Sequence, residues 1–516
     1  MDSLTVDAGA APSAVERRLA AMHMRPTTAI AVITAMLVLV ADSQALALVP
    51  LLNTMTEQYK LTAPQATIVL AIPALVAAGG VPVLTRVAER IGMRLFLLIG
   101  VIFTVVGNML CAMAPGYGLL LTGRALLGFS AAVPIGIALL RESSKSEKQT
   151  NNGLAVITAA VGVSVAISFL LGGVILKLNG TVHTVFWVMA VLGAVAFVMA
   201  WVMAPDYQTK VKDPADVVGA ILLVIALTAV AVYLSYGSTW HWTSGKGLTV
   251  LIVGLVVFAG WVWWELASKH PLIDIRKTFS RATVPAYFYV GLWGTIAVIS
   301  NLAVTNYAEF NAKMPIPLPA GSPAKSAPLD ALVKGVDYGF GDIVLTASLF
   351  LMPTAFFILL GGGVVGRIIT KLGTKNSMFV ASGLGILAFA FLAIDHTQQW
   401  ENYVGMGIWG MSYALGFAAG SAAYVHAAKE GEGSLFAAAA TVVTGTVGSL
   451  AAPVFTAVLY ASAVTLGTTQ IPTVASYNNV WWVCALGAVI GLALVLMHKK
   501  REYQGDTTAM DAALEV

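Results

Sequence analysis

The sequence has few charged residues and few cysteines, and each shortage excludes common classes of protein. Only 10% of the 516 residues are Asp, Glu, Lys or Arg, whereas soluble globular domains carry about 25%. So few charges cannot cover a water-exposed surface, which excludes a soluble cytosolic enzyme. The net charge of +4 is too small for a nucleic-acid-binding surface. The two cysteines, Cys111 and Cys484, lie in apolar runs, which excludes a disulfide scaffold and a cysteine-based metal site.

Several motifs of energy use and catalysis are also missing. The chain contains no Gly-x₄-Gly-Lys-Ser/Thr phosphate loop, no His-Glu-x-x-His pair and no nucleophile elbow, so ATP-driven transport and hydrolysis are not indicated. We therefore expect no enzyme activity, no metal site and no cofactor other than a proton gradient. The first 26 residues lack the apolar segment of a signal peptide, and we expect residues 1–27 to form a mobile cytosolic tail.

Long apolar runs dominate what is present. The hydrophobic fraction is 58% and the mean hydropathy is +0.84, values typical of a protein that crosses the bilayer many times. Short charged or Gly/Pro-rich breaks divide the runs into fourteen predicted transmembrane helices, and the expected fold class is an all-α polytopic membrane protein. The predicted spans are 28–52, 66–86, 94–114, 117–140, 153–178, 183–204, 215–236, 247–267, 283–308, 343–369, 376–395, 402–427, 434–460 and 478–498.

The distribution of basic residues predicts the orientation of these spans. With the N-terminus inside, 22 of the 29 Lys and Arg residues fall in cytosolic segments, 6 fall outside, and Arg124 lies within a span. This bias follows the positive-inside rule, so both termini are predicted in the cytoplasm. The high content of Ala, Val and Gly with short loops favours a bacterial inner membrane.

An internal repeat is visible between the two ends of the chain. The loops 85–94 and 366–375 carry Gly and basic residues at matching positions, offset by 281 residues, and Pro73 and Pro353 are offset by 280. Parallel repeats around a central pathway are typical of secondary transporters. We predict a cytosolic tail at 1–27, a six-helix bundle at 28–204, inserted helices at 215–267, a second bundle at 283–498 with an extracellular loop at 309–342, and a tail at 499–516.

Four short motifs resemble those of the major facilitator superfamily, most closely its fourteen-helix drug:proton antiporter branch. They are the loop Thr85–Arg94, the run Ala41–Pro50 in span one, the segment Arg124–Gly128 in span four, and Ser164, Ser168, Phe169, Gly172 and Gly173 in span five. The resemblance implies two helical bundles that rock around a substrate near the middle of the membrane. Phe169 replaces a proline of the branch's helix-five pattern, so symport and uniport stay open beside export.

Two charged residues lie deep in apolar spans. Asp42 is roughly 15 Å and Arg124 roughly 10 Å from the outer ends of their spans, at about 1.5 Å per helical residue. A charge in hydrocarbon is costly unless it is paired or hydrated, so both are candidates for function. We expect Asp42 to bind the coupling proton and Arg124 to pair with it. The alternative is a static structural ion pair.

Polar and aromatic residues form stripes in spans nine and twelve. Polar groups avoid lipid-facing surfaces, so these faces should line a cavity or pack on a neighbouring helix. We predict a substrate cavity for large amphipathic ligands, since such pockets are mostly apolar with a few placed polar groups. Packing is the alternative for such stripes. The predicted cavity residues are Tyr289, Trp293, Asn301, Thr305, Trp409 and Tyr413.

The two repeated loops are predicted to act as a conformational gate, in which charge pairs hold one state of the transport cycle. The alternative is that their charges only set the topology of the chain. The predicted gate residues are Glu89, Arg90, Gly92, Arg94, Gly366, Lys371, Gly373 and Lys375.

Together these features predict a proton-coupled exporter of a drug or another small organic molecule. Its partners are the substrate, protons and the lipid bilayer, with no nucleic acid, and it is expected to act as a monomer. A proton symporter or uniporter is the alternative within transport. A non-transporting receptor on a transporter fold and an intramembrane enzyme are the alternatives from other classes, although Asp42 and Arg124 alone offer an enzyme little chemistry.

Overall fold

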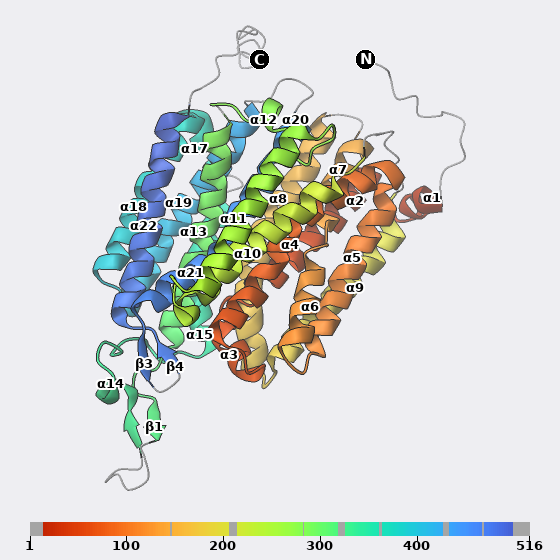
Figure 1. Ribbon diagram of the computed structural model, residues 1–516. Coiled ribbons are helices and arrows are strands. Elements are labelled where there is room, and N and C mark those ends of the chain that lie inside the picture. The colour runs from red at the N-terminus through yellow and green to blue at the C-terminus, as the bar shows by residue number, and fades with distance from the viewer. Residues whose placement is uncertain are drawn as a thin grey trace.

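The computed structural model describes residues 14–144, 147–205, 214–281, 283–317, 326–360, 364–426, 433–466 and 469–498. Its helices run between two ends of the molecule (Figure 1). The end with α3 and two short β-hairpins is here called the hairpin end, and the end with α12 and α17 is called the basic end. The predicted all-helical membrane fold is confirmed, because twelve helical spans of the described residues are long and apolar enough to cross a membrane.

The N-terminal half contains the first six predicted spans. Its helices are α2 (Pro26–Leu46), α3 (Leu52–Gln58), α4 (Ala63–Ile91), α5 (Met93–Ala112), α6 (Tyr117–Leu127), α7 (Ala132–Ser143), α8 (Glu147–Lys177) and α9 (Val182–Met203).

The C-terminal half contains the last six predicted spans. Its helices are α13 (Val284–Glu309), α15 (Val344–Leu349), α16 (Met352–Leu360), α17 (Gly366–Leu372), α18 (Thr374–Ile394), α19 (Gln399–His426), α20 (Gly433–Ser449), α21 (Ala451–Leu459) and α22 (Val474–Met497).

Three predicted spans are interrupted rather than continuous. The breaks separate α6 from α7, α15 from α16, and α20 from α21. Each break precedes a proline in the first turn of the next helix: Pro134, Pro353 and Pro453. Proline is tolerated in a first turn because the N–H that it lacks has no partner within the helix, whereas farther into a helix it removes a hydrogen bond and favours a kink or a break. The hydropathy of the sequence does not reveal these breaks, because the residues on both sides of each break are apolar.

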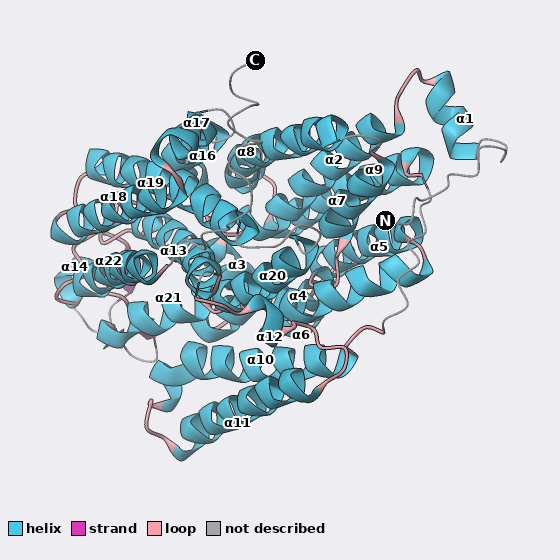
Figure 2. Ribbon diagram, turned by 90° about the horizontal axis from the view of Figure 1, so that it is seen from above, coloured by secondary structure: helices cyan, strands magenta, loops and turns pink. Residues whose placement is uncertain are grey.

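The two inserted helices, α10 (Val217–Trp240) and α11 (Gly245–Ala267), lie along one edge of the molecule (Figure 2). α10 packs against α4 and α21, whereas α11 packs mainly against α10. Asp216 joins the pair, since its carboxylate accepts hydrogen bonds from the Gly219 amide at 2.8 Å and from Trp264 Nε1 at 3.0 Å. The short helix α12 (Ile275–Thr278) follows and contacts α11 and α20.

The prediction of a mobile N-terminal tail over 1–27 is wrong for its second part. Residues Ala14–Ala21 form the helix α1, and α2 begins at Pro26. Val15 and Leu19 of α1 are buried with Ala29 and contact Met203 at the end of α9. These two apolar residues, one helical turn apart in an otherwise polar segment, are enough to hold α1 against the ends of α2 and α9. Residues 1–13 and the predicted tail 499–516 lie outside the described residues.

The long loop 309–342 is partly ordered by the core of the C-terminal half. It contains the antiparallel strands β1 (Pro315–Pro317) and β2 (Ser326–Pro328) and the helix α14 (Leu329–Leu332). Leu329, Val336 and Tyr338 are buried in the same apolar cluster as α13 and α22. A second hairpin, β3 (Val464–Leu466) with β4 (Thr469–Ile471), follows the 3₁₀ turn Tyr460–Ser462.

The halves meet along two pairs of segments. On one side α8 packs against α15 and α16, and on the other α4 packs against α20 and α21. Three glycines lie where the backbones of the two halves approach each other. A Cβ on Gly173 would lie 2.6 Å from Cα of Leu345, one on Gly162 would lie 2.7 Å from Cα of Leu359, and one on Gly445 would lie 3.6 Å from Cα of Ala78.

Candidate functional site

Asp42 lies in the last turns of α2, on the seam between α2 and α8. Its carboxylate accepts a hydrogen bond from the Ser164 hydroxyl, and one turn along α8 the hydroxyls of Ser43 and Ser168 are 3.3 Å apart. Asp42 keeps an intermediate exposure, whereas Ser43 and Ser168 are buried. The i, i+4 spacing of Ser164 and Ser168 places both hydroxyls on one face of α8. This short polar seam inside the apolar N-terminal half gives a carboxyl group a defined position.

The opposite half approaches the same carboxylate. Tyr413, on α19, lies within electrostatic range of Asp42 and keeps an intermediate exposure. The two side chains come from sequence positions 371 residues apart and from different halves. Of the six predicted cavity residues, Tyr413 is therefore the one that the structure places near the predicted proton site. A carboxyl group between two moving bodies is placed to sense their relative position.

Arg124 and Asp42 do not form a direct pair in this structure, which corrects the prediction of direct contact. Arg124 is 2% exposed, and its guanidinium donates from Nε to the carbonyl of Val69 at 3.0 Å and from Nη1 to the carbonyl of Gln44 at 2.9 Å. Among the described residues no ion pair joins Arg124 to Asp42. Both carbonyls belong to helices that flank α6, so Arg124 clamps α2 and α4 together. Sequence depth placed the two charges at similar levels but could not show which way each side chain points.

This clamp predicts a large loss of stability when Arg124 is replaced. In Arg124→Leu the carbonyls of Gln44 and Val69 lose their donors, and each buried group left unpaired costs about 1–3 kcal/mol. We expect a clearly lower thermal unfolding midpoint in detergent, measured by intrinsic tryptophan fluorescence. The matched control is Lys334→Leu, which removes a charge from an exposed loop position and should leave the midpoint unchanged. If both variants have the same unfolding midpoint, water must supply the hydrogen bonds that the Arg124 guanidinium donates in the wild type.

The other five predicted cavity residues are packed inside the C-terminal half, so the alternative of packing applies to them. Tyr289, Trp293 and Trp409 are fully buried. The rings of Tyr289 and Trp293 stack at 4.1 Å. The Tyr289 hydroxyl donates to the Met378 carbonyl at 3.0 Å, and Trp293 Nε1 donates to the Ser412 carbonyl at 3.2 Å. Asn301 and Thr305 are also buried. A polar stripe avoids lipid equally well on a neighbouring helix and in a cavity.

The glycines of the predicted gate have equivalent positions in the two repeats. Gly92, with φ 148°, joins α4 to α5, and Gly373, with φ 79°, joins α17 to α18. A positive φ strains other residues, so glycine is required for each tight link. Gly366 begins α17 and is exposed.

Two basic residues of the predicted gate also make equivalent contacts. Arg94 Nη2 donates to the Trp201 carbonyl at 2.9 Å, and Lys375 Nζ donates to the His498 carbonyl at 3.0 Å. Trp201 lies at the end of α9 and His498 caps α22, the last helix of each half. Each base therefore stabilises the negative end of a helix within its own half. These bonds support the repeat, but they do not form the predicted latch between halves.

The remaining gate residues lie at the surface of the basic end. Arg86 Nη1 and Glu89 Oε2 form an ion pair of 3.0 Å within one turn of α4. Arg90 and Lys371 are exposed. An exposed pair contributes little stability, so a role of these side chains in gating stays a prediction.

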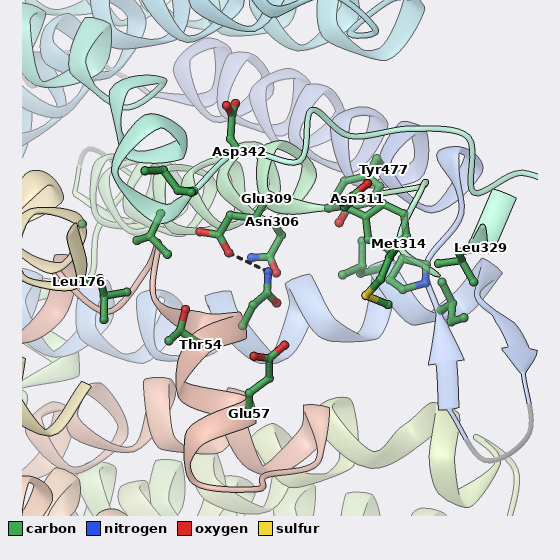
Figure 3. Close-up of a pocket in the computed structure, with 18 of the residues that line it drawn as sticks. Thr54, Glu57, Leu176, Asn306, Glu309, Asn311, Met314, Leu329, Asp342 and Tyr477 are labelled. Atoms are coloured by element: carbon green, nitrogen blue, oxygen red, sulfur yellow. Dashed lines mark hydrogen bonds between the residues drawn. The ribbon is translucent and has the colours of Figure 1, made fainter. Parts of the chain in front are cut away.

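A cavity of about 1080 Å³ opens between the halves at the hairpin end (Figure 3). α3 and the end of α8 line it from the N-terminal half, and the end of α13, the segment 342–345 and Tyr477 line it from the C-terminal half. Asn53 Nδ2 donates to Glu309 Oε2 at 2.9 Å across this cavity. Sequence analysis missed both residues, because each lies directly after the end of a predicted span, where polar and charged residues are ordinary. In the described ranges no group of three or more His, Cys, Asp or Glu side chains is placed to hold a metal ion.

Comparison with known proteins identifies the fold as that of a transporter. The sequence profile described as Major Facilitator Superfamily matches residues 31–453. The chain belongs to this superfamily. It is therefore a multi-pass membrane protein of a superfamily of transporters, as the sequence motifs predicted, and the relatives named below are transporters rather than enzymes.

Individual relatives of this superfamily member are distant. The chain is 23% identical over 314 residues to the major facilitator superfamily multidrug transporter mfsC of Aspergillus fumigatus, covering 60% of this chain and 54% of that protein, about half its length. It is 26% identical over 392 residues to a uridine/deoxyuridine transporter of Lactococcus lactis, covering 69% and 80%. A solved POT family transporter in complex with a thioalcohol-conjugated peptide has a TM-score of 0.62 at 14% identity and covers 91% of this chain and 94% of its own, which shows the shared fold.

Proposed function

We propose that this protein exports a small organic molecule in exchange for protons, by alternating access of a site between its halves. The observation that carries the proposal is the position of Asp42. Its carboxyl group lies within a span, is hydrogen-bonded to Ser164, keeps partial exposure, and lies within electrostatic range of Tyr413 of the other half. A titratable group in such a position is expected to serve ion coupling, because an idle charge there would only cost stability.

The cycle follows from the contacts between the halves. The close approaches at Gly173 and Gly162 let α8 pack on α15 and α16, so the halves can close toward the hairpin end. Rocking about this contact exposes the site to one side and then to the other. Binding of a proton by Asp42 and binding of the organic solute would alternate. The proton gradient supplies the energy, the protein acts as a monomer, and the basic end, with both termini, faces the cytoplasm.

The substrate class rests on the relatives and on the chemistry of the site. The name of the Aspergillus fumigatus relative describes a multidrug transporter, and Asp42 with Tyr413 offers a carboxylate and an aromatic ring to a solute. Such a combination suits an amphipathic organic compound.

The test is a proton-flux assay with purified protein in liposomes that contain a pH-sensitive dye. A proton gradient is imposed, and a panel of lipophilic cations and neutral drugs is then added. We expect at least one compound to drive proton movement that empty liposomes do not show. Flux of a compound without proton movement would identify a uniporter, and proton movement in the same direction as the compound would identify a symporter. Saturable binding with no flux of any compound would favour the receptor.

A further inference from the structure

The cavity at the hairpin end is lined by charged residues that take no part in the proposed Asp42 site. Its lining carries three carboxylates, Glu57, Glu309 and Asp342, and one ammonium group, Lys177. Glu57 comes from the N-terminal half, and Glu309 and Asp342 come from the C-terminal half, so acidic residues line the cavity from both halves (Figure 3). Asp342 Oδ1 also accepts a hydrogen bond from the Thr346 hydroxyl at 3.1 Å. Opposed walls of one sign of charge concentrate ions of the other sign. The cavity is therefore suited to a cation.

Glu309 is held in this cavity by a hydrogen bond to only one of its two carboxylate oxygens. Oε2 accepts from Asn53, whereas the buried Oε1 has no hydrogen-bond partner among the described residues. A buried carboxyl oxygen without a hydrogen-bond partner is costly. Figure 3 shows the carboxylate of Glu309 in the wall of the cavity, where it accepts the hydrogen bond across the two halves. A ligand with a positive charge would satisfy it.

Much of the rest of the lining is apolar, and the cavity is large enough for an organic molecule. Leu176, Ile343, Leu345 and Tyr477 contribute to the walls. A volume of about 1080 Å³ is at the upper end of the range of small-molecule sites. Hydrated metal ions would gain nothing from such walls, whereas an organic cation would bury its apolar surface against them.

We propose that this cavity binds an organic cation, that Glu309 is the residue that holds its charge, and that Asn53 competes with the cation for Glu309. When the cation takes over the carboxylate, the hydrogen bond between the halves breaks, and the hairpin end is released. The inference that the cavity lies on the exit path rests on the proposed export function. The binding itself does not, and it can be measured without any transport.

The experiment measures protection of a cysteine in the cavity. Thr54→Cys is introduced after the buried Cys111 and Cys484 are replaced by alanine. Cells that express the protein are labelled from outside with a membrane-impermeant maleimide. The probe is ethidium, an organic cation, and uncharged Nile red is the control compound. Ethidium is expected to slow labelling in a saturable way, whereas Nile red is not.

Three further variants test the roles of the residues. Glu309→Gln keeps the size of the side chain and an acceptor for Asn53 but removes the charge, and we expect at least about tenfold more ethidium for half protection. Asp337→Asn removes an exposed carboxylate outside the cavity and should change nothing. Asn53→Ala removes the competitor, so protection should occur at roughly two- to tenfold lower ethidium concentrations, the range expected for one hydrogen bond.

The outcomes separate this proposal from the proposed function. Absence of protection by ethidium, or equal effects of Glu309→Gln and Asp337→Asn, would overturn the cation site. Weaker protection in Asn53→Ala would overturn the competition. A folded Glu309→Gln protein is verified by gel filtration, and Asn53→Ala gives an independent answer if that variant does not fold. Protection without substrate-driven proton flux would leave the cavity site standing and the export function overturned.

Discussion

Asp42→Asn is expected to abolish substrate-driven proton movement and leave the protein folded. The amide has the size of the carboxyl group and can still accept a hydrogen bond from Ser164, but it cannot take up or release a proton at physiological pH. In liposomes with an internal pH dye, the signal should fall to the level of empty liposomes. Exchange of labelled for unlabelled substrate, which needs no net proton transfer, should persist, but at higher substrate concentrations, because the solute loses its contact with the carboxylate.

Ser164→Ala is the matched control for this variant, because it removes the hydrogen bond and leaves the carboxyl group. We expect it to alter the substrate concentration for half-maximal flux without abolishing the coupling. Coupled proton movement that survives Asp42→Asn at the wild-type rate would remove Asp42 from the mechanism. Coupling lost in both variants, with both proteins folded, would show that the hydrogen bond rather than the charge is required.

Gly173→Ala is expected to hold the hairpin end open. The added methyl group would lie 2.6 Å from Cα of Leu345, a backbone atom that cannot move unless α8 and α15 separate. Overpacking of this kind costs about 1–3 kcal/mol, which corresponds to a population shift of roughly 5- to 150-fold. Ala45 is exposed and lies one turn beyond Asp42 on α2. Labelling of Ala45→Cys from the hairpin side should accelerate by a similar factor, and the transport rate should fall.

Gly294→Ala controls for the change of residue type, because this helical glycine in α13 has open space at its Cβ position. It should leave labelling and transport unchanged. An unchanged labelling rate in Gly173→Ala would show that the halves do not separate along α8 and α15. A faster rate in Gly294→Ala as well would mean that helix propensity, rather than the collision with Leu345, opens the site.

The membrane fold could be predicted from the sequence because its signals are local. Each span is specified by about 20 consecutive apolar residues, and twelve such helices are present among the described residues. The repeat could also be predicted, since Gly92 and Gly373 occupy equivalent positions, each in a tight link between two helices. Asp42 was identified because a carboxylate within an apolar run has few structural explanations. Composition, order and spacing were sufficient for these statements.

Partners of individual side chains depended on the tertiary structure. A polar residue can avoid lipid either by lining a cavity or by packing against a neighbouring helix, and the sequence does not distinguish the two. The stripe that contains Tyr289 and Trp293 was therefore predicted to line a cavity, whereas the structure places it in the core. Arg124 found backbone carbonyls rather than a carboxylate, because the rotation of a helix about its axis is set by packing. Asn53 and Glu309 meet across 256 residues, a distance over which no local pattern operates. The sequence by itself therefore determined which segments cross the membrane and which residue carries an unusual charge, whereas only the packing of the two halves decided what each charge touches.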